Sequence, residues 1–317
     1  MFTSWCWLKF DFTNTGQIGD TIGGIMGPFI AVAAAILTFL AFWVQFKANE
    51  IQRQDIKLER FENKFYESIQ LHKSNLNEIN IADKLHGRKC FVHMFYELKF
   101  AYHKVEEVLN KINDSAGNKY DNVNIMSLAY RIFFFGIGTH SEKNYYPYLN
   151  TEEKSVFNKL KPELEIIQNN VLKYFGNDPW KKGYYTFESS GKTKSKNEGI
   201  EFFYYPFDGH ANRLGHYYRH LFQTTNHVVS QDFLNDDEKY IYIKTLRAQL
   251  SNYEQLLLYY NALAWSDVHW RVIMTKFRFI KNLPLGLADF HEKPEEHFKS
   301  EINALRSKGI EIFEWLE

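Results

Sequence analysis

The most constraining feature of the chain is an uncharged run, IMGPFIAVAAAILTFLAFWV, from Ile25 to Val44. A helix of this length crosses the hydrocarbon core of a bilayer, which is about 30 Å thick. Thr38 carries the only hydroxyl group in the run, so nearly the whole helix surface is apolar. The sequence therefore predicts a transmembrane helix over residues 25–46. A buried core helix and a secretory signal are the alternatives.

The charges around this run predict its orientation. Basic residues follow the run closely: Lys47, Arg53, Lys57 and Arg60. Residues 1–24, which we expect to form an interfacial segment, hold Lys9 against Asp11 and Asp20. Since cytoplasmic flanks carry the excess of Lys and Arg, we expect a single-pass topology with a cytoplasmic C-terminal part. A secretory signal is disfavoured because its positive charges would precede the apolar run.

Residues 47–86 are predicted to continue the membrane helix as a polar stalk. Ile51, Leu58, Phe65 and Ile79 repeat at seven-residue spacing, and His72 interrupts the series. Such a repeat is typical of a coiled coil, which would make the stalk a homodimerising helix. The alternative is an amphipathic helix packed on its own domain, and the repeat is too short to distinguish the two.

The remaining residues, 87–317, are predicted to form a helical domain. Apolar residues at helical spacing predict helices near residues 91–112, 125–137 and 152–176, and a further amphipathic helix up to Leu316. Residues 177–199 are rich in Gly, Ser and Lys, which indicates a mobile loop or a hairpin. The fold class is therefore all-α: one transmembrane helix, a stalk and a helical bundle.

Composition excludes some functions. The chain has 38 basic and 38 acidic residues, a formal net charge of zero, which argues against a general nucleic-acid coat. Its two cysteines, Cys6 and Cys90, are far apart, so the sequence offers no disulfide framework. No phosphate-binding loop, nucleophile elbow or dinucleotide fingerprint is present. Nucleotide hydrolysis and α/β-hydrolase chemistry therefore have no support.

The segment from Phe202 to Trp265 predicts two helices that face each other. The first separates an apolar stripe from a polar stripe. The apolar stripe is Leu214, Tyr218, Leu221, Thr225 and Val228, and the polar stripe is Arg213, His216, His220, Gln223 and His227. On the second helix, Arg247, Glu254 and Asn261 repeat every seven residues beside an apolar seam. This spacing is too long for pairing within one helix, so we expect desolvated side chains with partners on another helix.

These residues resemble a known family. The blocks GHYYRHLFQTTNHV and LRAQLSNYEQLLLYYNAL are similar to those of bacterial phage abortive infection proteins, the AbiC-like family. Further similar blocks are GDTIGGIMGPFIA, ERFENKFYESIQLHKSNLNEI, GRKCF, AYRIFFFGIG and FIKNLP, so the resemblance covers roughly residues 19 to 284. It implies a membrane-attached antiviral role at the bacterial inner membrane. It brings no settled set of catalytic residues.

The sharpest catalytic hypothesis concerns Arg213 and His220. Their spacing on one helix resembles the active motif of HEPN-type RNases, which need no metal. A His can move a proton to or from a ribose hydroxyl, while a guanidinium stabilises charge on phosphorus. Leu214 replaces the usual polar residue after the Arg, and both side chains could instead bond within the bundle. A zinc site built on His216 and His220 lacks clear further ligands, so we predict no metal and no cofactor.

The competing hypothesis is a non-enzymatic membrane switch. Its cytoplasmic domain would bind a phage or host component, and the stalk would transmit the change to the membrane helix. The predicted binding residues are His210, His216, Arg219, Gln223, His227, Arg247, Glu254 and Asn261. The expected partners are membrane lipid, further copies of the chain, a phage protein or RNA, and a protein from the same defence operon.

Overall fold

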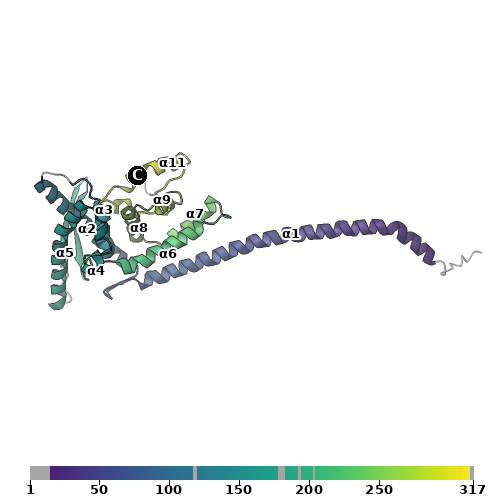
Figure 1. Cartoon of the computed structure of the whole chain (residues 1–317), viewed down its shortest axis with the longest axis horizontal. Coiled ribbons are helices and arrows are strands. Elements are labelled where there is room, and N and C mark those ends of the chain that lie inside the picture. Colours follow the sequence, from purple (N-terminus) through teal and green to yellow (C-terminus); the bar gives the residue numbers. More distant parts are fainter. Residues whose placement is uncertain (1–14, 117–119, 178–182, 192–193, 203, 315–317) are drawn as a thin grey trace, which may run out of the picture. The chain divides into compact units, whose positions relative to one another are not determined.

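A computed structural model describes residues 15–116, 120–177, 183–191, 194–202 and 204–314. The chain forms two compact units, Met1–Lys64 and Phe65–Glu317 (Figure 1). Helix α1, Thr15–Glu78, contributes residues to both units. Residues 1–14 of the predicted interfacial segment lie outside the described residues.

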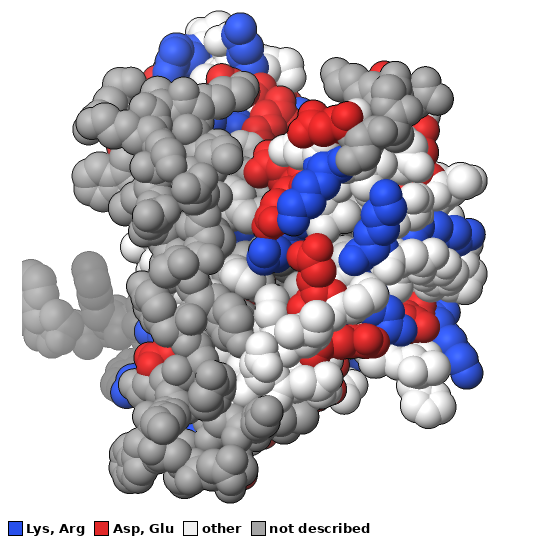
Figure 2. Space-filling model, turned by 90° about the vertical axis from the view of Figure 1, so that its left-hand side faces the viewer, with Lys and Arg blue, Asp and Glu red and all other residues white. Residues whose placement is uncertain are grey.

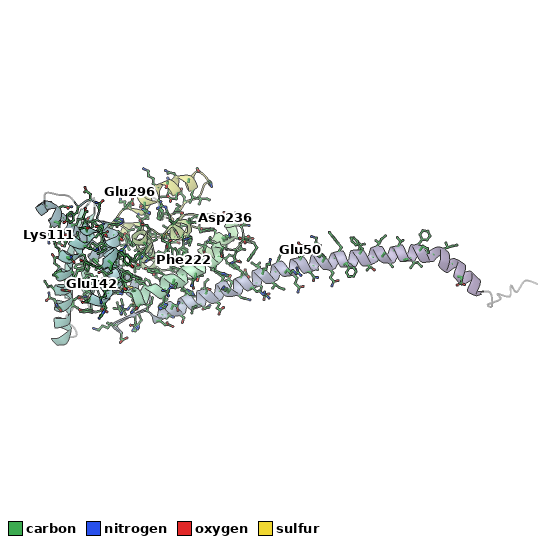
Figure 3. The ribbon with its side chains drawn as sticks, in the orientation of Figure 1. Glu50, Lys111, Glu142, Phe222, Asp236 and Glu296 are labelled. Carbon is green, nitrogen blue, oxygen red and sulfur yellow. The ribbon has the colours of Figure 1, made fainter. Side chains whose placement is uncertain are left out.

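The described part of the N-terminal unit is the long first part of α1. From Ile22 on, this helix is long and apolar enough to cross a membrane, with a mean hydropathy of 2.3 in its most apolar stretch. Its large side chains have no cover within the unit, since Phe29 is 70% exposed and Leu37 67% exposed (Figure 3). An apolar surface of this extent is unfavourable in water and favourable in lipid.

The second unit begins with the last turns of α1. The stalk helix expected over residues 47–86 ends earlier, at Glu78. It is followed by a short antiparallel hairpin of β1, Asn80–Ile81, and β2, Leu85–His86. The Gly87 N–H donates to the Ile79 carbonyl at 2.8 Å and closes this reversal. Gly87 adopts a φ of +58°, a conformation that glycine tolerates well.

Part of the seven-residue repeat in α1 serves to pack the helix on its own domain. Phe65 and Ile79 of the repeat, and Ile69 and Leu76 between them, are buried in the second unit. Each such side chain contributes roughly 1.5–3 kcal/mol by leaving water. For these turns the intramolecular alternative holds. Ile51 and Leu58, in the other unit, are 60% and 38% exposed.

The rest of the second unit is mainly helical, as the all-α prediction requires. Its longer helices are α2 (Arg88–Ala116), α3 (Ile125–Phe135), α5 (Thr151–Asn177), α6 (Ala211–Val229), α7 (Asp236–Arg247), α8 (Asn252–Trp265), α9 (Val268–Thr275) and α11 (Lys299–Arg306). Short elements are α4 (Thr139–Glu142), η2 (Tyr146–Tyr148), η3 (Leu285–Leu287) and α10 (Pro294–His297). Helix α2 packs against α3, α5 and α8, and α3 also packs against α8.

The segment predicted as a loop or hairpin contains an antiparallel hairpin. Strands β3, Gly183–Gly191, and β4, Lys194–Phe202, pair with Gly183 opposite Phe202. Pro162 does not split α5, which runs through it. The predicted C-terminal helix is shorter than expected, because α11 ends at Arg306 and Gly309 then adopts a φ of +71°. Leu316 lies outside the described residues.

The core of the second unit is aromatic. Its largest fully buried side chains are Tyr130, Tyr145, Tyr217, Tyr259, Tyr260, Phe65, Phe91, Phe95, Phe100, Phe133, Phe157 and Phe202. Tyr260 stacks on Phe290 with ring centroids 4.4 Å apart, and Phe95 meets Tyr253 edge-on at 5.5 Å. Such pairs contribute beyond the area they bury.

Charge on the molecular surface is mixed. On the face drawn in Figure 2, basic and acidic side chains alternate over the described residues without a broad patch of one sign. This distribution agrees with the zero net charge of the chain. On this face, the described residues therefore present no uniform field of one sign.

Candidate functional site

Helix α6 has the two faces that its sequence predicts. Leu214, Leu221 and Val228 are fully buried. The polar stripe on the other side is half-buried or exposed. In Figure 1, α6 runs beside the last turns of α1, and the ring of His72 meets that of Tyr217 at 5.1 Å. The polar face of α6 therefore has the end of α1 as its neighbour.

Two glycines fix where α6 begins. Gly136 and Gly209 have φ values of +86° and +93°, and their backbones cross at close range. A Cβ atom on Gly209 would lie 2.4 Å from the Phe135 carbonyl oxygen, which is a severe clash. The His210 N–H donates to the Phe134 carbonyl at 2.8 Å across this crossing. A larger residue at either glycine would displace the start of α6.

The buried carboxylate of Glu97 stabilises the same backbone crossing before α6. Glu97 of α2 has no exposed surface and accepts hydrogen bonds from the Phe207 N–H at 2.8 Å and the Tyr204 hydroxyl. Nε2 of His210 lies 3.1 Å from the Glu97 carboxylate. Burial, followed by the charge of Glu97, raises the pKa of Tyr204 well above its usual value. These three partners satisfy a charge that would otherwise be costly to bury.

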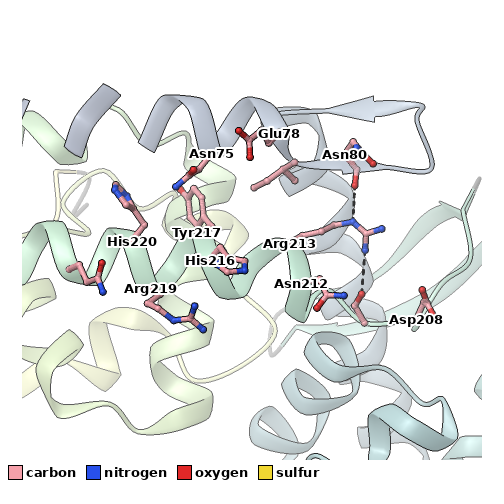
Figure 4. A pocket seen from close by; sticks show the side chains of 13 residues that line it. Asn75, Glu78, Asn80, Asp208, Asn212, Arg213, His216, Tyr217, Arg219 and His220 are labelled. Carbon is pink, nitrogen blue, oxygen red and sulfur yellow. Dashed lines mark hydrogen bonds between the residues drawn. The ribbon is translucent and has the colours of Figure 1, made fainter. Parts of the chain in front are cut away.

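A cleft of about 740 Å³ opens between the end of α1 and the polar face of α6 (Figure 4). Its α1 side is formed by Asn75 and Glu78 with Ile79 and Asn80. Its α6 side is formed by Asn212, Arg213, His216, Tyr217, Arg219, His220 and Gln223, with Asp208 and Gly209 before the helix. The volume is typical of ligand sites, which span roughly 300–1,000 Å³. Its lining, however, is unusually polar.

Arg213 is held in place by main-chain groups. Its Nε donates to the Asn80 carbonyl at 2.7 Å and its Nη1 to the Gly209 carbonyl at 3.3 Å. These bonds tie the hairpin after α1 to the start of α6. Because a guanidinium has five N–H donors, others remain for a ligand.

His220 lies two turns along the same face and contacts a second imidazole. Its ring stacks with that of His72 at a centroid distance of 6.4 Å. Burial lowers the pKa of His72 to about 4, and the neighbouring His220 and Arg88 add to this. Burial also lowers the pKa of His220. Nδ1 of His220 is buried without a hydrogen-bond partner among the described residues.

The prediction of two facing helices was wrong. The second helix is interrupted at 248–251, and α7 and α8 are separate. Ser251 and Glu254 form a capping box that starts α8: the Glu254 carboxylate accepts from the Ser251 N–H at 2.7 Å. Such a box satisfies N–H groups that a new helix leaves free. The fully buried Tyr217 reaches Glu254, at 2.8 Å, whereas the polar stripe faces α1.

The other predicted binding residues are dispersed. Arg219 and Gln223 line the cleft and are exposed, as is His216. His210 lies buried against Glu97. Arg247, Glu254 and Asn261 are desolvated as expected but do not line the cleft.

Their partners come from other elements. Arg247 donates to the Arg278 carbonyl at 2.7 Å, and Asn261 donates to the Tyr130 hydroxyl at 2.7 Å. Glu254 also meets Arg88 of α2 at 3.4 Å. His227, near the end of α6, accepts from the Gln231 side chain through its carbonyl at 2.6 Å.

Sequence reasoning missed the α1 side of the cleft. His72, Asn75 and Glu78 belong to the predicted stalk, where His72 interrupts the apolar repeat. The interruption of the repeat at His72 was the one sequence signal that this part of α1 has a polar role. Among the described residues, no group of three or more His, Cys, Asp or Glu side chains is placed to hold a metal ion.

Residues 209–287 match the family model described as "Putative phage abortive infection protein". This segment is therefore similar to that family. The resemblance seen in the sequence is thereby confirmed over α6, α7, α8 and α9. The family segment supplies the α6 side of the cleft, while the α1 side lies outside the matched residues. No curated protein and no solved structure matches the chain.

Proposed function

We propose that this chain is a membrane-anchored abortive infection protein of bacteria, and that its cleft binds a phage or host component during infection. The observation that carries the proposal is the position of the family segment: its first helix, α6, forms one side of the cleft. The cleft exposes Arg219, His216 and Gln223 to solvent. A concave site of this size in which polar groups converge is a candidate for ligand binding.

The apolar part of α1 supports the membrane anchor. Its surface lacks cover and its length suits a bilayer. Basic residues directly after it favour a cytoplasmic second unit. Binding at the cleft would act as a switch only if the ligand prefers one of two states of the protein.

The proposal is tested in phage-challenged bacteria that express the full chain. Intact protein is expected to lower phage plating, and the double variant Arg219→Ala with Gln223→Ala is expected to abolish this protection. Replacing Leu37 and Leu40 with Arg, inside the apolar run, should release the protein from the membrane fraction and also abolish protection. Lys308→Ala, an exposed change outside the cleft, is the matched control. Full protection by the cleft variant would refute the binding role.

The second candidate function is a metal-independent RNase that uses Arg213 and His220. The favourable observation is that both residues line the same cleft. Burial lowers the pKa of His220, as a neutral base requires, and its buried Nδ1 has no hydrogen-bond partner among the described residues. Against this function, two donors of Arg213 already bind carbonyl groups.

RNA cleavage by the purified full chain decides between these functions. An RNase would degrade RNA in the presence of a chelator, and His220→Ala would abolish this activity. His140→Ala, an exposed histidine outside the cleft, is the control. Intact RNA, together with protection that survives His220→Ala in cells, would eliminate the RNase.

A further inference from the structure

The charges that line the cleft form no ion pair with one another or with other described residues. Glu78, Asp208 and Arg219 are exposed, and Arg213 binds only carbonyl oxygens. Elsewhere in the second unit, acidic and basic side chains pair readily, as in Lys161 with Glu142 at 2.6 Å. The cleft therefore gathers two carboxylates and two guanidiniums that are available to a ligand (Figure 4).

The signs of these charges restrict the ligand. A polyphosphate or nucleic-acid backbone would gain from Arg213 and Arg219 but would be repelled by Glu78 and Asp208. A purely cationic ligand would be attracted by Glu78 and Asp208 but repelled by Arg213 and Arg219. Only a ligand with charges of both signs can satisfy both pairs, because like charges placed together cost affinity.

The uncharged part of the lining points to peptide groups. Carboxamides occur on both sides of the cleft: Asn75 and Asn80 near the end of α1, and Asn212 and Gln223 on α6. A carboxamide offers donors and an acceptor at once, which matches the N–H and C=O of a peptide backbone. Tyr217, the one Tyr, Phe or Trp among the described lining residues, is 1% exposed, so the large aromatic rings on which single-stranded nucleic acid stacks are not offered here, and His216 is the exposed ring.

We infer that the cleft takes a polypeptide segment that carries both acidic and basic side chains. This inference rests on the proposed function and names the class of the component bound. The segment can belong to a phage protein or a host protein, and the chemistry of recognition is the same.

Charge reversal at opposite signs tests the inference by the direction of its effect. In phage-challenged cells, a mixed-charge polypeptide predicts that Arg219→Glu and Glu78→Lys each reduce protection at least tenfold. A nucleic acid predicts a loss for Arg219→Glu but equal or stronger protection for Glu78→Lys. Lys308→Glu and Glu67→Lys are the controls, and Glu67 is an exposed residue on the same helix as Glu78.

A photo-crosslinking amino acid at Asn226 of the full chain, an exposed residue of α6 three positions after Gln223 and outside the cleft lining, identifies the ligand class directly. The inference is supported if a polypeptide adduct forms and if Arg219→Glu and Glu78→Lys each abolish it. Comparison of infected with uninfected cells then distinguishes a phage polypeptide from a host polypeptide. An RNA adduct, or no adduct while protection persists, overturns it. Protection lost in the cleft double variant together with an RNA adduct leaves the proposed function intact. Absence of any protection by the intact chain instead removes the proposed function.

Discussion

Two pairs of acidic residues in the second unit differ in their surroundings. Glu97 and Glu254 have no exposed surface, and each carboxylate meets three partners that other residues of the fold provide. Glu78 and Asp208 line the cleft, are exposed, and meet none among the described residues. The partners of the first group come from the fold. Under the proposed binding role, a ligand would supply those of the second group.

This difference separates stability from function. A buried carboxylate is tolerated only while its hydrogen bonds are complete, so removing it or a partner destabilises the fold. An exposed carboxylate in a cleft is already solvated, so its removal leaves the free energy of unfolding nearly unchanged. Substitutions at Glu97 or Glu254 should therefore lower the free energy of unfolding. Substitutions at Glu78 or Asp208 should leave it nearly unchanged but reduce protection against phage.

Glu97→Ala is expected to have the largest effect on stability. It leaves the Tyr204 hydroxyl, the Phe207 N–H and His210 without their partner. The free energy of unfolding should decrease by roughly 3–5 kcal/mol, the usual cost of breaking a buried charged network. Thermal unfolding of the full chain should shift down by about 10 °C. Glu67→Ala, an exposed control, should not shift it. An unchanged transition for Glu97→Ala would remove the distinction between the two groups.

His72 predicts a loss of stability in acid. Its pKa in the folded protein is about 4, below the usual value near 6.5, so the unfolded chain binds its proton first. The contribution of His72 to the free energy of unfolding is complete above pH 6.5. It decreases by up to about 3 kcal/mol as the pH falls to about 4. Burial is the main cause that opposes its protonation, followed by the neighbouring His220 and Arg88.

The measurement is chemical denaturation of the full chain between pH 4 and 7. His72→Phe should flatten the dependence, because the aromatic contact with Tyr217 is kept while the titrating group is removed. An equally steep dependence in this variant would mean that other groups cause the acid sensitivity.

Tyr217→Phe is expected to have a smaller effect. It removes one hydrogen bond, that from the Tyr217 hydroxyl to Glu254 at 2.8 Å, and leaves the ring packed. The cost should be about 1–2 kcal/mol, because a buried carboxylate oxygen loses a donor. Tyr148→Phe, at a side chain that is 77% exposed, is the matched control. Equal unfolding midpoints for the two variants would show that Glu254 does not depend on Tyr217.

The faces of α6 could be predicted from the sequence because they follow a regular helical period. Leu214, Leu221 and Val228 recur on one side, and burial at these positions is complete. The break between α7 and α8 also had a local signal, Ser251 followed three residues later by Glu254, which is a capping-box pattern. The seven-residue repeat of Arg247, Glu254 and Asn261 appeared to continue one helix and concealed that signal.

The cleft itself could not be predicted. Its two sides are brought together by tertiary contacts such as that between Arg213 and the Asn80 carbonyl, which are separated by 133 residues in sequence. Periodicity describes one helix at a time and does not say which helix covers it. Glu97 was missed for the same reason, since its partners lie 107 to 113 residues away.

Arg219→Ala is expected to have the smallest effect on stability and a large effect on protection. The guanidinium is exposed and forms no hydrogen bond or ion pair with other described residues, so the free energy of unfolding should change by less than about 0.5 kcal/mol. Protection should nevertheless decrease, because a ligand loses one of the two guanidiniums of the cleft. Denaturation and phage plating of the same variant provide the test. A destabilisation comparable to that of Tyr217→Phe would show that Arg219 belongs to the fold. Its loss of protection could then no longer be attributed to binding.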